Sequence, residues 1–226
     1  MRRLGVLGGM GPEATVDLMA RLQRATPARD DADHVPLIVD MNPQVPSRIA
    51  HLIEKTGPDP GPVLAAMAAR LEGAGAEALI LPCNTAHHYA DAITGAVAIP
   101  LLHMPALTCD ALARVTGGAV GVLASPATRA IGLFEPLLAA RGLSALWPED
   151  EAPVLAAIRA IKARGPTEED ATLLTDQARA LAARGAGAIL VGCTEFSLLS
   201  GRIAVDVPVV DALDVLVDAA LAFARD

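Results

Sequence analysis

The chain has 226 residues, of which 53% are hydrophobic and only 2% aromatic, and its formal net charge is −8. This length allows one large domain or two small ones, with a core built mainly from Ala, Leu, Val and Ile. The negative charge argues against a general affinity for nucleic acid or for anionic membranes. We recognise no secretory signal and no apolar run approaching ~20 residues, and three cysteines make a poor disulfide framework. We therefore expect a cytoplasmic protein with reduced thiols that does not cross a membrane.

Strands and helices alternate along the first half of the chain. The predicted elements are a strand at 3–9, a helix from Pro12 to about Arg24, a strand at 35–40, a short helix containing Arg48, a helix ending near Glu72, a strand at 77–82 and a helix starting near Asn84. Glycines at positions 8, 9 and 11 allow a tight turn after the first strand. The periodicity of the first helix predicts that Val16, Met19 and either Leu22 or Ala20 face the core.

The second half continues the alternation. It predicts a strand at 99–103, a helix through Cys109, a strand at 119–123, a helix begun by Ser125 and Pro126, helices at 152–164 and 167–184, strands at 188–191 and 207–210, and a terminal helix. Thr167 to Asp170 resembles a capping box, and Ser125 suits an N-cap position. The strands are continuously apolar, which is typical of parallel α/β sheets covered by helices on both faces.

The two halves also repeat each other. The segment Gly75 to Cys83 aligns with Gly185 to Cys193, and two further segments match in the same order at nearly the same offset. We therefore expect two similar, pseudo-symmetric three-layer α/β domains, comprising residues 1–98 plus 210–226 and residues 99–209. Ligands of open α/β sheets bind at the carboxyl ends of strands, so we expect the active site in the cleft between the domains.

Cys83 and Cys193 occupy equivalent places, each directly after a buried strand. A thiol has a reference pKa of ~8.5, so it can both accept and donate a proton near neutral pH. We expect the N–H groups of the following helix start to lower both thiol pKa values. Two such groups on opposite sides of one carbon atom would suit racemisation, in which one removes the α-proton and the other returns a proton.

Three motifs, in this order, resemble the aspartate/glutamate/hydantoin racemase superfamily, and within it the aspartate racemase branch. They are Gly8-Gly9-Met10-Gly11-Pro12, Pro82-Cys83-Asn84-Thr85-Ala86-His87 and Gly192-Cys193-Thr194-Glu195. The resemblance covers essentially the whole chain. It implies a cofactor-independent two-base racemase of two interlocked α/β domains, often a homodimer, that acts on an acidic amino acid.

The same resemblance implies the roles of individual residues. Cys83 and Cys193 would be the two acid/bases, and Arg48 and Lys162 would bind substrate carboxylates. The implied substrate-binding residues are Met10, Gln44, Arg48, Asn84, Thr85, Thr128, Lys162, Thr194 and Glu195. In most proteins Arg48 and Lys162 would be ordinary surface charges. The chain departs from the usual family form at Ser125-Pro126, which leaves the substrate preference open.

Plainer interpretations of these residues stay open beside the family match. Cysteine is often buried, so either thiol alone could belong to the core, and Cys109 lies in a helix without a polar turn. Cys83 and His87 are four residues apart and could share a metal ion, but no third ligand has suitable spacing. We therefore predict no metal site, and a His87 that orients local hydrogen bonds.

Other functions also fit part of the sequence. The segment Gly9 to Ala14 fits a dinucleotide fingerprint, with Asp40 as a ribose-binding acid, but this leaves the cysteine repeat unexplained. A non-catalytic amino-acid-binding protein would not need both thiols. Within the superfamily, a broad-specificity or glutamate racemase and a maleate isomerase-like enzyme remain alternatives to an aspartate racemase.

Overall fold

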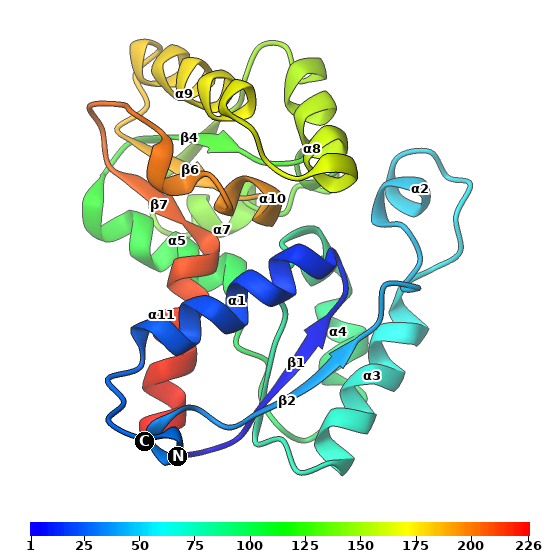
Figure 1. Ribbon diagram of the computed structural model, residues 1–226. Coiled ribbons are helices and arrows are strands. Elements are labelled where there is room, and N and C mark those ends of the chain that lie inside the picture. The colour runs from blue at the N-terminus through cyan, green and yellow to red at the C-terminus, as the bar shows by residue number, and fades with distance from the viewer. The chain divides into compact units, whose positions relative to one another are not determined.

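The chain folds into two units, each built around its own β-sheet. The computed structural model describes all 226 residues, as unit 1 (Met1–Met104 and Leu213–Asp226) and unit 2 (Pro105–Ala212). The chain passes into unit 2 along α5 (Met104–Val115) and returns along α11 (Ala212–Arg225) (Figure 1). Every strand pairing in both sheets is parallel, which confirms the predicted α/β fold class. None of the helices combines the length and hydrophobicity that crossing a bilayer requires.

Unit 1 has a three-stranded sheet in the order β2-β1-β3. Its elements are β1 (Leu4–Gly8), α1 (Pro12–Ala25), the 3₁₀ turn η1 (Asp31–Asp33), β2 (Leu37–Met41), α2 (Arg48–Leu52), α3 (Gly61–Gly73), β3 (Ala78–Ile80), the 3₁₀ turn η2 (Thr85–Tyr89) and α4 (Ala90–Thr94). The central strand β1 is buried along its whole length, and both α1 and α3 contact it. Because the strands are parallel, the segments that follow β1, β2 and β3 begin at one edge of the sheet.

Unit 2 has a four-stranded sheet in the order β5-β4-β6-β7. Its elements after α5 are β4 (Ala119–Leu123), α6 (Pro126–Ala130), α7 (Glu135–Ala139), β5 (Ser144–Leu146), α8 (Ala152–Arg164), α9 (Glu168–Ala183), β6 (Ala188–Val191), α10 (Thr194–Ser197), the 3₁₀ turn η3 (Ser200–Arg202) and β7 (Val209–Asp211). Sequence reasoning missed α7 and the edge strand β5. Both are too short to show a periodic pattern, and β5 is only partly buried.

Two predicted elements differ from the structure in kind. The predicted strand at 99–103 is reduced to one bridge between Leu101 and Leu79. Leu79 donates its N–H to the carbonyl of Pro100 at 2.8 Å, but proline has no N–H with which to extend the ladder. The predicted helix near Asn84 begins as the tighter turn η2 and becomes α-helical only in α4.

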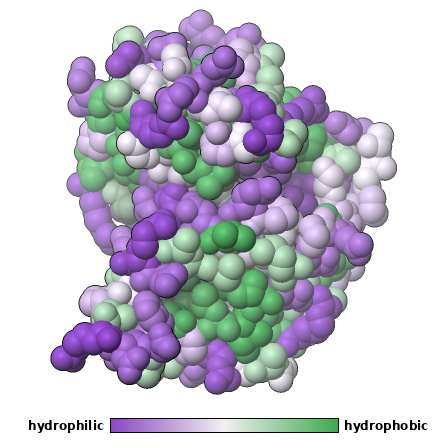
Figure 2. Space-filling view, viewed as in Figure 1, coloured by the Kyte–Doolittle hydropathy of each residue, from purple (hydrophilic) through white to green (hydrophobic).

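Helix α1 is rotated relative to the sequence prediction. Its buried residues are Ala14, Thr15, Leu18 and Leu22, whereas Val16 is 55% exposed. The prediction that Val16 faces the core is therefore wrong. Leu18 and Leu22 form the apolar stripe that packs inward, and Thr15 lies on the same face, where its hydroxyl accepts the N–H of Gly9 at 3.0 Å. Some apolar side chains stay at the surface of unit 1, and Figure 2 shows a hydrophobic patch over α1 and β2.

The packing of one glycine in each unit supports the internal repeat. Gly5 in β1 and Gly121 in β4 have no room for a side chain, because a Cβ atom at either would lie 2.9 Å or less from its closest neighbour. The closest neighbours are Ala76, Leu79 and Leu71 around Gly5, and Ile189, Leu181 and Ala186 around Gly121. These two sets occupy equivalent places in the aligned segments. Each unit therefore brings the strand that precedes its cysteine against its central strand in the same way.

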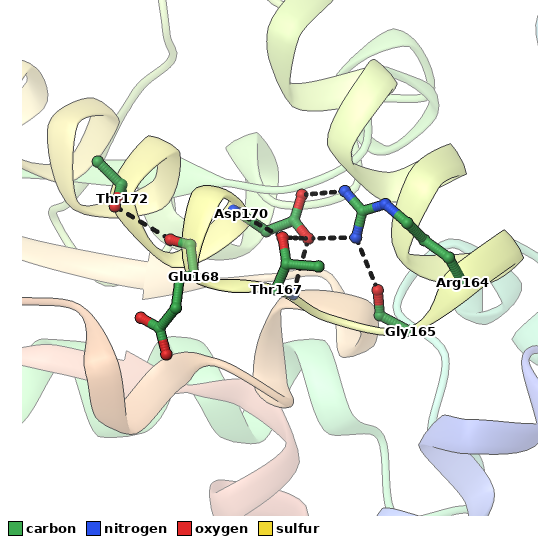
Figure 3. Close-up of polar contacts among 6 residues, drawn as sticks. All are labelled: Arg164, Gly165, Thr167, Glu168, Asp170 and Thr172. Atoms are coloured by element: carbon green, nitrogen blue, oxygen red, sulfur yellow. Dashed lines mark hydrogen bonds and ion pairs between the residues drawn. The ribbon is translucent and has the colours of Figure 1, made fainter.

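The junction of α8 and α9 is held by a buried carboxylate (Figure 3). Asp170, 5% exposed, accepts the N–H and the hydroxyl of Thr167, and Thr167 caps α9 as predicted. Arg164 donates to both oxygens of the same carboxylate, at 2.8 and 3.1 Å. The hydrogen bonds from Arg164 and Thr167 hold the pKa of Asp170 below its usual value. This network fixes the end of α8, two residues beyond Lys162.

Candidate active site

The glycine turn after β1 serves the packing of a neighbouring loop. Gly9 has a φ of +94°, and a Cβ atom there would lie 2.4 Å from the carbonyl of Asn42. Its N–H already donates to Thr15. A dinucleotide site would need free N–H groups in this turn and a free acid at Asp40, but Asp40 accepts two hydrogen bonds from Arg70, at 2.6 and 3.1 Å. The turn does not favour the dinucleotide interpretation.

The loop after β2 is tied to the end of β1 and leads into α2. Asn42 donates its N–H to the carbonyl of Gly8 at 3.2 Å, and its side-chain oxygen accepts the N–H of Gln44 at 3.0 Å. The side chain of Gln44 is exposed, while Met10, in the turn after β1, is buried. These predicted substrate-binding residues thus follow two neighbouring strands at the same sheet edge.

Arg48 is a cation that forms no ion pair. It lies at the first position of α2, where Ser47 is the N-cap, and it is partly buried. Its Nη1 donates to the carbonyls of Val45 and Pro46, at 3.3 and 2.9 Å. These contacts hold the guanidinium against the loop and leave its other N–H donors available. A cation without a counter-ion in a protein of net charge −8 is suited to bind an anionic ligand.

The turn after β3 contains a buried amide with no hydrogen-bond partner. Cys83 is 8% exposed and Asn84 is 3% exposed. Neither Nδ2 nor Oδ1 of Asn84 forms a hydrogen bond within the protein. A buried polar group left unpaired costs about 1–3 kcal/mol, so such groups are rare in folded proteins and call for an explanation. Asn84, next to Cys83 in the chain, is therefore a buried amide that no group of the protein satisfies.

His87 holds the Cys83 turn in place as a neutral imidazole. The N–H of Met104 donates to its Nε2 at 3.2 Å, so Nδ1 carries the hydrogen that is donated to the carbonyl of Cys83 at 2.8 Å. Burial, with nearby His103, lowers the pKa of His87 to about 3. With both nitrogens occupied, His87 orients local hydrogen bonds, as predicted. No three His, Cys, Asp or Glu side chains are grouped to bind a metal ion.

In unit 2, Cys193, Glu195 and Lys162 form one hydrogen-bonded chain. Cys193 follows β6 and donates its thiol hydrogen to Oε2 of Glu195 at 2.9 Å. The other oxygen of Glu195 lies 2.8 Å from Nζ of Lys162, which projects from α8. Cys193 and Glu195 are 7% and 9% exposed. The structure therefore brings three of the predicted site residues into direct contact.

The environment of Cys193 raises its pKa, so the prediction that a helix start would lower it is wrong for this residue. Burial is the main cause, and the negative charge of Glu195 and its hydrogen bond to the thiol act in the same direction. Lys162 and a backbone N–H partly oppose them. Helix α10 has only four residues, so its N–H groups favour the thiolate too weakly to offset burial and Glu195. Burial and the contact with Glu195 therefore favour the neutral thiol form of Cys193.

The remaining predicted residues of unit 2 follow the ends of β4 and β6. Thr128 is fully buried and donates its N–H to the carbonyl of Ser125 at 2.8 Å, and Thr194 is 3% exposed at the start of α10. Ser125 caps α6, as predicted. Cys109, by contrast, is completely buried in α5, and burial raises its pKa to about 12. It is a core residue.

Comparison with known proteins places this geometry in context. A family model described as "Asp/Glu/Hydantoin racemase" matches residues 7–220. The chain is 24% identical over 220 residues to the broad specificity amino-acid racemase RacX of Bacillus subtilis, covering 92% of each protein. It is 27% identical over 201 residues to the glutamate racemase of Deinococcus radiodurans, covering 83% of this chain and 62% of that protein.

Solved structures give a similar result. The structure of Picrophilus torridus aspartate racemase matches with a TM-score of 0.89 and 26% identity, covering 100% of this chain and 95% of that one. These matches confirm the family resemblance that the three motifs indicated.

The lowered pKa of His87 predicts a stability that declines in mild acid. The unfolded chain binds a proton at His87 near pH 6.5, whereas the folded protein does so only near pH 3. The contribution of neutral His87 to the free energy of unfolding is therefore at its full value above pH 6.5. It falls by about 1.4 kcal/mol per pH unit as the pH decreases toward 3. Denaturant unfolding from pH 7 to pH 5 should show this slope. His87→Gln should flatten it, and the exposed neighbour variant His88→Gln should not; equal slopes in all three proteins would contradict the assignment.

The contacts of Cys193 predict opposite effects of its two charged neighbours. Because the Glu195 carboxylate raises the thiol pKa and Lys162 lowers it, Glu195→Gln should lower that pKa and Lys162→Gln should raise it. The pH dependence of alkylation, measured in a Cys83→Ser background, reports the Cys193 titration. Glu169→Gln, an exposed acid on α9, is the control that should leave the curve unchanged. If the pKa of Cys193 shifted in the same direction in Glu195→Gln and Lys162→Gln, the contacts with Glu195 and Lys162 would not be what controls that pKa.

Proposed function

Because the chain belongs to the Asp/Glu/hydantoin racemase family, we propose that it interconverts L- and D-aspartate by proton transfer at the α-carbon, without a cofactor. The observation that carries this proposal is the equivalence of Cys83 and Cys193, which follow corresponding strands of two similarly packed sheets. The match to an aspartate racemase structure over 100% of the chain supports the choice of substrate.

The proposed reaction uses the two thiols in turn. In one direction, the Cys83 thiolate removes the α-proton and forms an S–H bond, and the electron pair of the C–H bond passes into the carboxylate. The thiol of Cys193 then gives its proton to the opposite face of the carbon. We assign this donor role to Cys193 because Glu195 keeps it protonated. In the reverse direction the two cysteines exchange roles, so a Cys193 thiolate forms next to the Glu195 carboxylate. The positive charge of Lys162 then partly neutralises these two adjacent negative charges.

The α-proton of an amino acid is only weakly acidic, so the site must stabilise the carbanion strongly. We propose that Asn84, Thr85 and Thr194 donate hydrogen bonds to the α-carboxylate, where negative charge accumulates. Each preorganised donor of this kind contributes about 3–4 kcal/mol, and correct positioning contributes about 7–11 kcal/mol. The unpaired amide of Asn84 beside Cys83 supports this assignment.

Arg48 is the proposed ligand of the side-chain carboxylate. It is the better candidate of the two predicted cations because Lys162 already binds Glu195, whereas Arg48 forms no ion pair. Broad-specificity racemisation is the second candidate, since the chain is similar to RacX over 92% of its length. Measuring the racemisation of a panel of acidic and neutral amino acids distinguishes an aspartate racemase from a broad-specificity racemase.

The thiol assignment predicts the behaviour of cysteine variants. The purified protein without added cofactor should convert L-aspartate to D-aspartate, followed by chiral chromatography. Cys83→Ala and Cys193→Ala should each lose at least about 1,000-fold in kcat, because general acid–base catalysis contributes up to about 10⁴-fold. Cys109→Ala is the matched control and should retain activity. Substantial turnover by either of the first two variants would rule out the two-thiol reaction.

The role of Arg48 predicts a selective loss. Arg48→Ala should raise KM for L-aspartate by about 10-fold or more, because a charge-assisted hydrogen bond contributes about 1.5–3 kcal/mol. Any turnover of L-alanine should change little. Arg70→Ala, which removes an arginine bound to Asp40 elsewhere in unit 1, provides the control. Equal losses for both substrates would assign Arg48 to the α-carboxylate or to the loop instead.

A further inference from the structure

Tyr89 places an unpaired hydroxyl in the interior of unit 1. It is the last residue of η2, the turn that begins just after Cys83, and only 7% of its surface is exposed. Its phenol oxygen is buried and forms no hydrogen bond within the protein. A buried hydroxyl without a partner destabilises a fold, and phenylalanine would fill the same space without that cost. The hydroxyl is therefore unexplained by the packing of the folded chain alone.

The ring of Tyr89 lies against α2, the helix that begins with Arg48. Its centroid is 6.1 Å from that of His51, one helical turn beyond Arg48, and 5.0 Å from that of His88. Nδ1 of His51 lies 3.1 Å from the carbonyl of Gly57, so His51 is held by its own loop. Tyr89 is thus packed between the Cys83 turn and the helix of the unpaired arginine.

The charges around Tyr89 keep its phenol protonated. Burial and the nearby Asp59 raise its pKa to about 12, and Arg48 partly opposes this shift. Arg48 belongs to α2, the same five-residue helix whose His51 ring lies against Tyr89. At neutral pH, Tyr89 therefore offers an O–H donor, and Arg48 offers N–H donors and a positive charge that forms no ion pair.

An unpaired O–H donor near a guanidinium that forms no ion pair suits a carboxylate, and the nearby Asp59 accepts the N–H of Gly61 rather than pairing with Arg48. We propose that Tyr89 is a specificity-determining residue, whose hydroxyl donates a hydrogen bond to the side-chain carboxylate of the acidic substrate held by Arg48. This inference rests on the proposed function for the identity of the substrate. It assigns to the segment from Cys83 to Tyr89 a second role besides positioning the thiol: it also selects a dicarboxylate.

The test is Tyr89→Phe, compared with the wild-type protein and with Arg70→Ala, which changes an arginine bound to Asp40 elsewhere in unit 1. Tyr89→Phe should raise KM for L-aspartate about 10-fold or more and keep kcat within a few-fold of the wild-type value. The reason is that the hydroxyl binds the substrate side chain equally in the ground state and in the transition state. Its thermal unfolding temperature should stay equal or rise, since the free protein loses only an unpaired group. A merely structural tyrosine would lower that temperature and leave KM unchanged.

A binding measurement separates this inference from the proposed reaction. Succinate, a dicarboxylate that cannot racemise, is titrated into wild type, Tyr89→Phe and Arg48→Ala by calorimetry. Weaker succinate binding by Tyr89→Phe supports the inference even if the wild type does not racemise aspartate. Racemisation by the wild type with unchanged KM and succinate affinity in Tyr89→Phe overturns the inference and leaves the function standing. A wild type that neither racemises aspartate nor binds succinate overturns both.

Discussion

Parallel strand pairing is the constraint on which the candidate site depends. In unit 1 it places the segments after β1, β2 and β3 at one edge of the sheet, and in unit 2 it does the same for β4 and β6. Small residues make the pairing close, since Gly5 and Gly121 leave no space for a side chain. Residues far apart in the sequence therefore reach the same edge because hydrophobic packing aligns the strands that precede them.

The two thiols occupy equivalent places in the repeat but differ in their surroundings. Cys83 lies beside an unpaired amide and has its carbonyl bound by a neutral histidine. Cys193 donates to a buried carboxylate, which a lysine neutralises. In the proposed reaction, burial and Glu195 favour the protonated form of Cys193 before substrate arrives. A symmetric pair of thiols would lack such a preference, so the divergence of the two halves has a chemical consequence.

The sequence predicted those parts of the structure that depend on local patterns. Continuous apolar runs located the main strands, and Thr167 with Asp170 identified a helix start, because these signals lie within a few residues of each other. The rotation of α1 was missed because apolar residues lie on both sides of this helix, and only the fold shows that Leu18 and Leu22 are buried while Val16 is exposed. The raised pKa of Cys193 was missed because its main cause is burial in the folded chain, and because only the fold shows that the Glu195 carboxylate turns back onto the thiol. Tyr89 gave no signal, since only the folded structure shows that its hydroxyl lacks a partner.

The most direct test of a two-base racemase is the fate of the α-hydrogen in heavy water. L-aspartate is incubated with the protein, and both enantiomers are isolated after a small fraction of turnover and analysed by NMR. If separate thiols serve the two faces, the D-aspartate formed should carry deuterium at the α-carbon while the remaining L-aspartate keeps its hydrogen. D-aspartate that retains the original hydrogen, or deuterium entering both enantiomers equally from the start, would indicate one base and contradict the account.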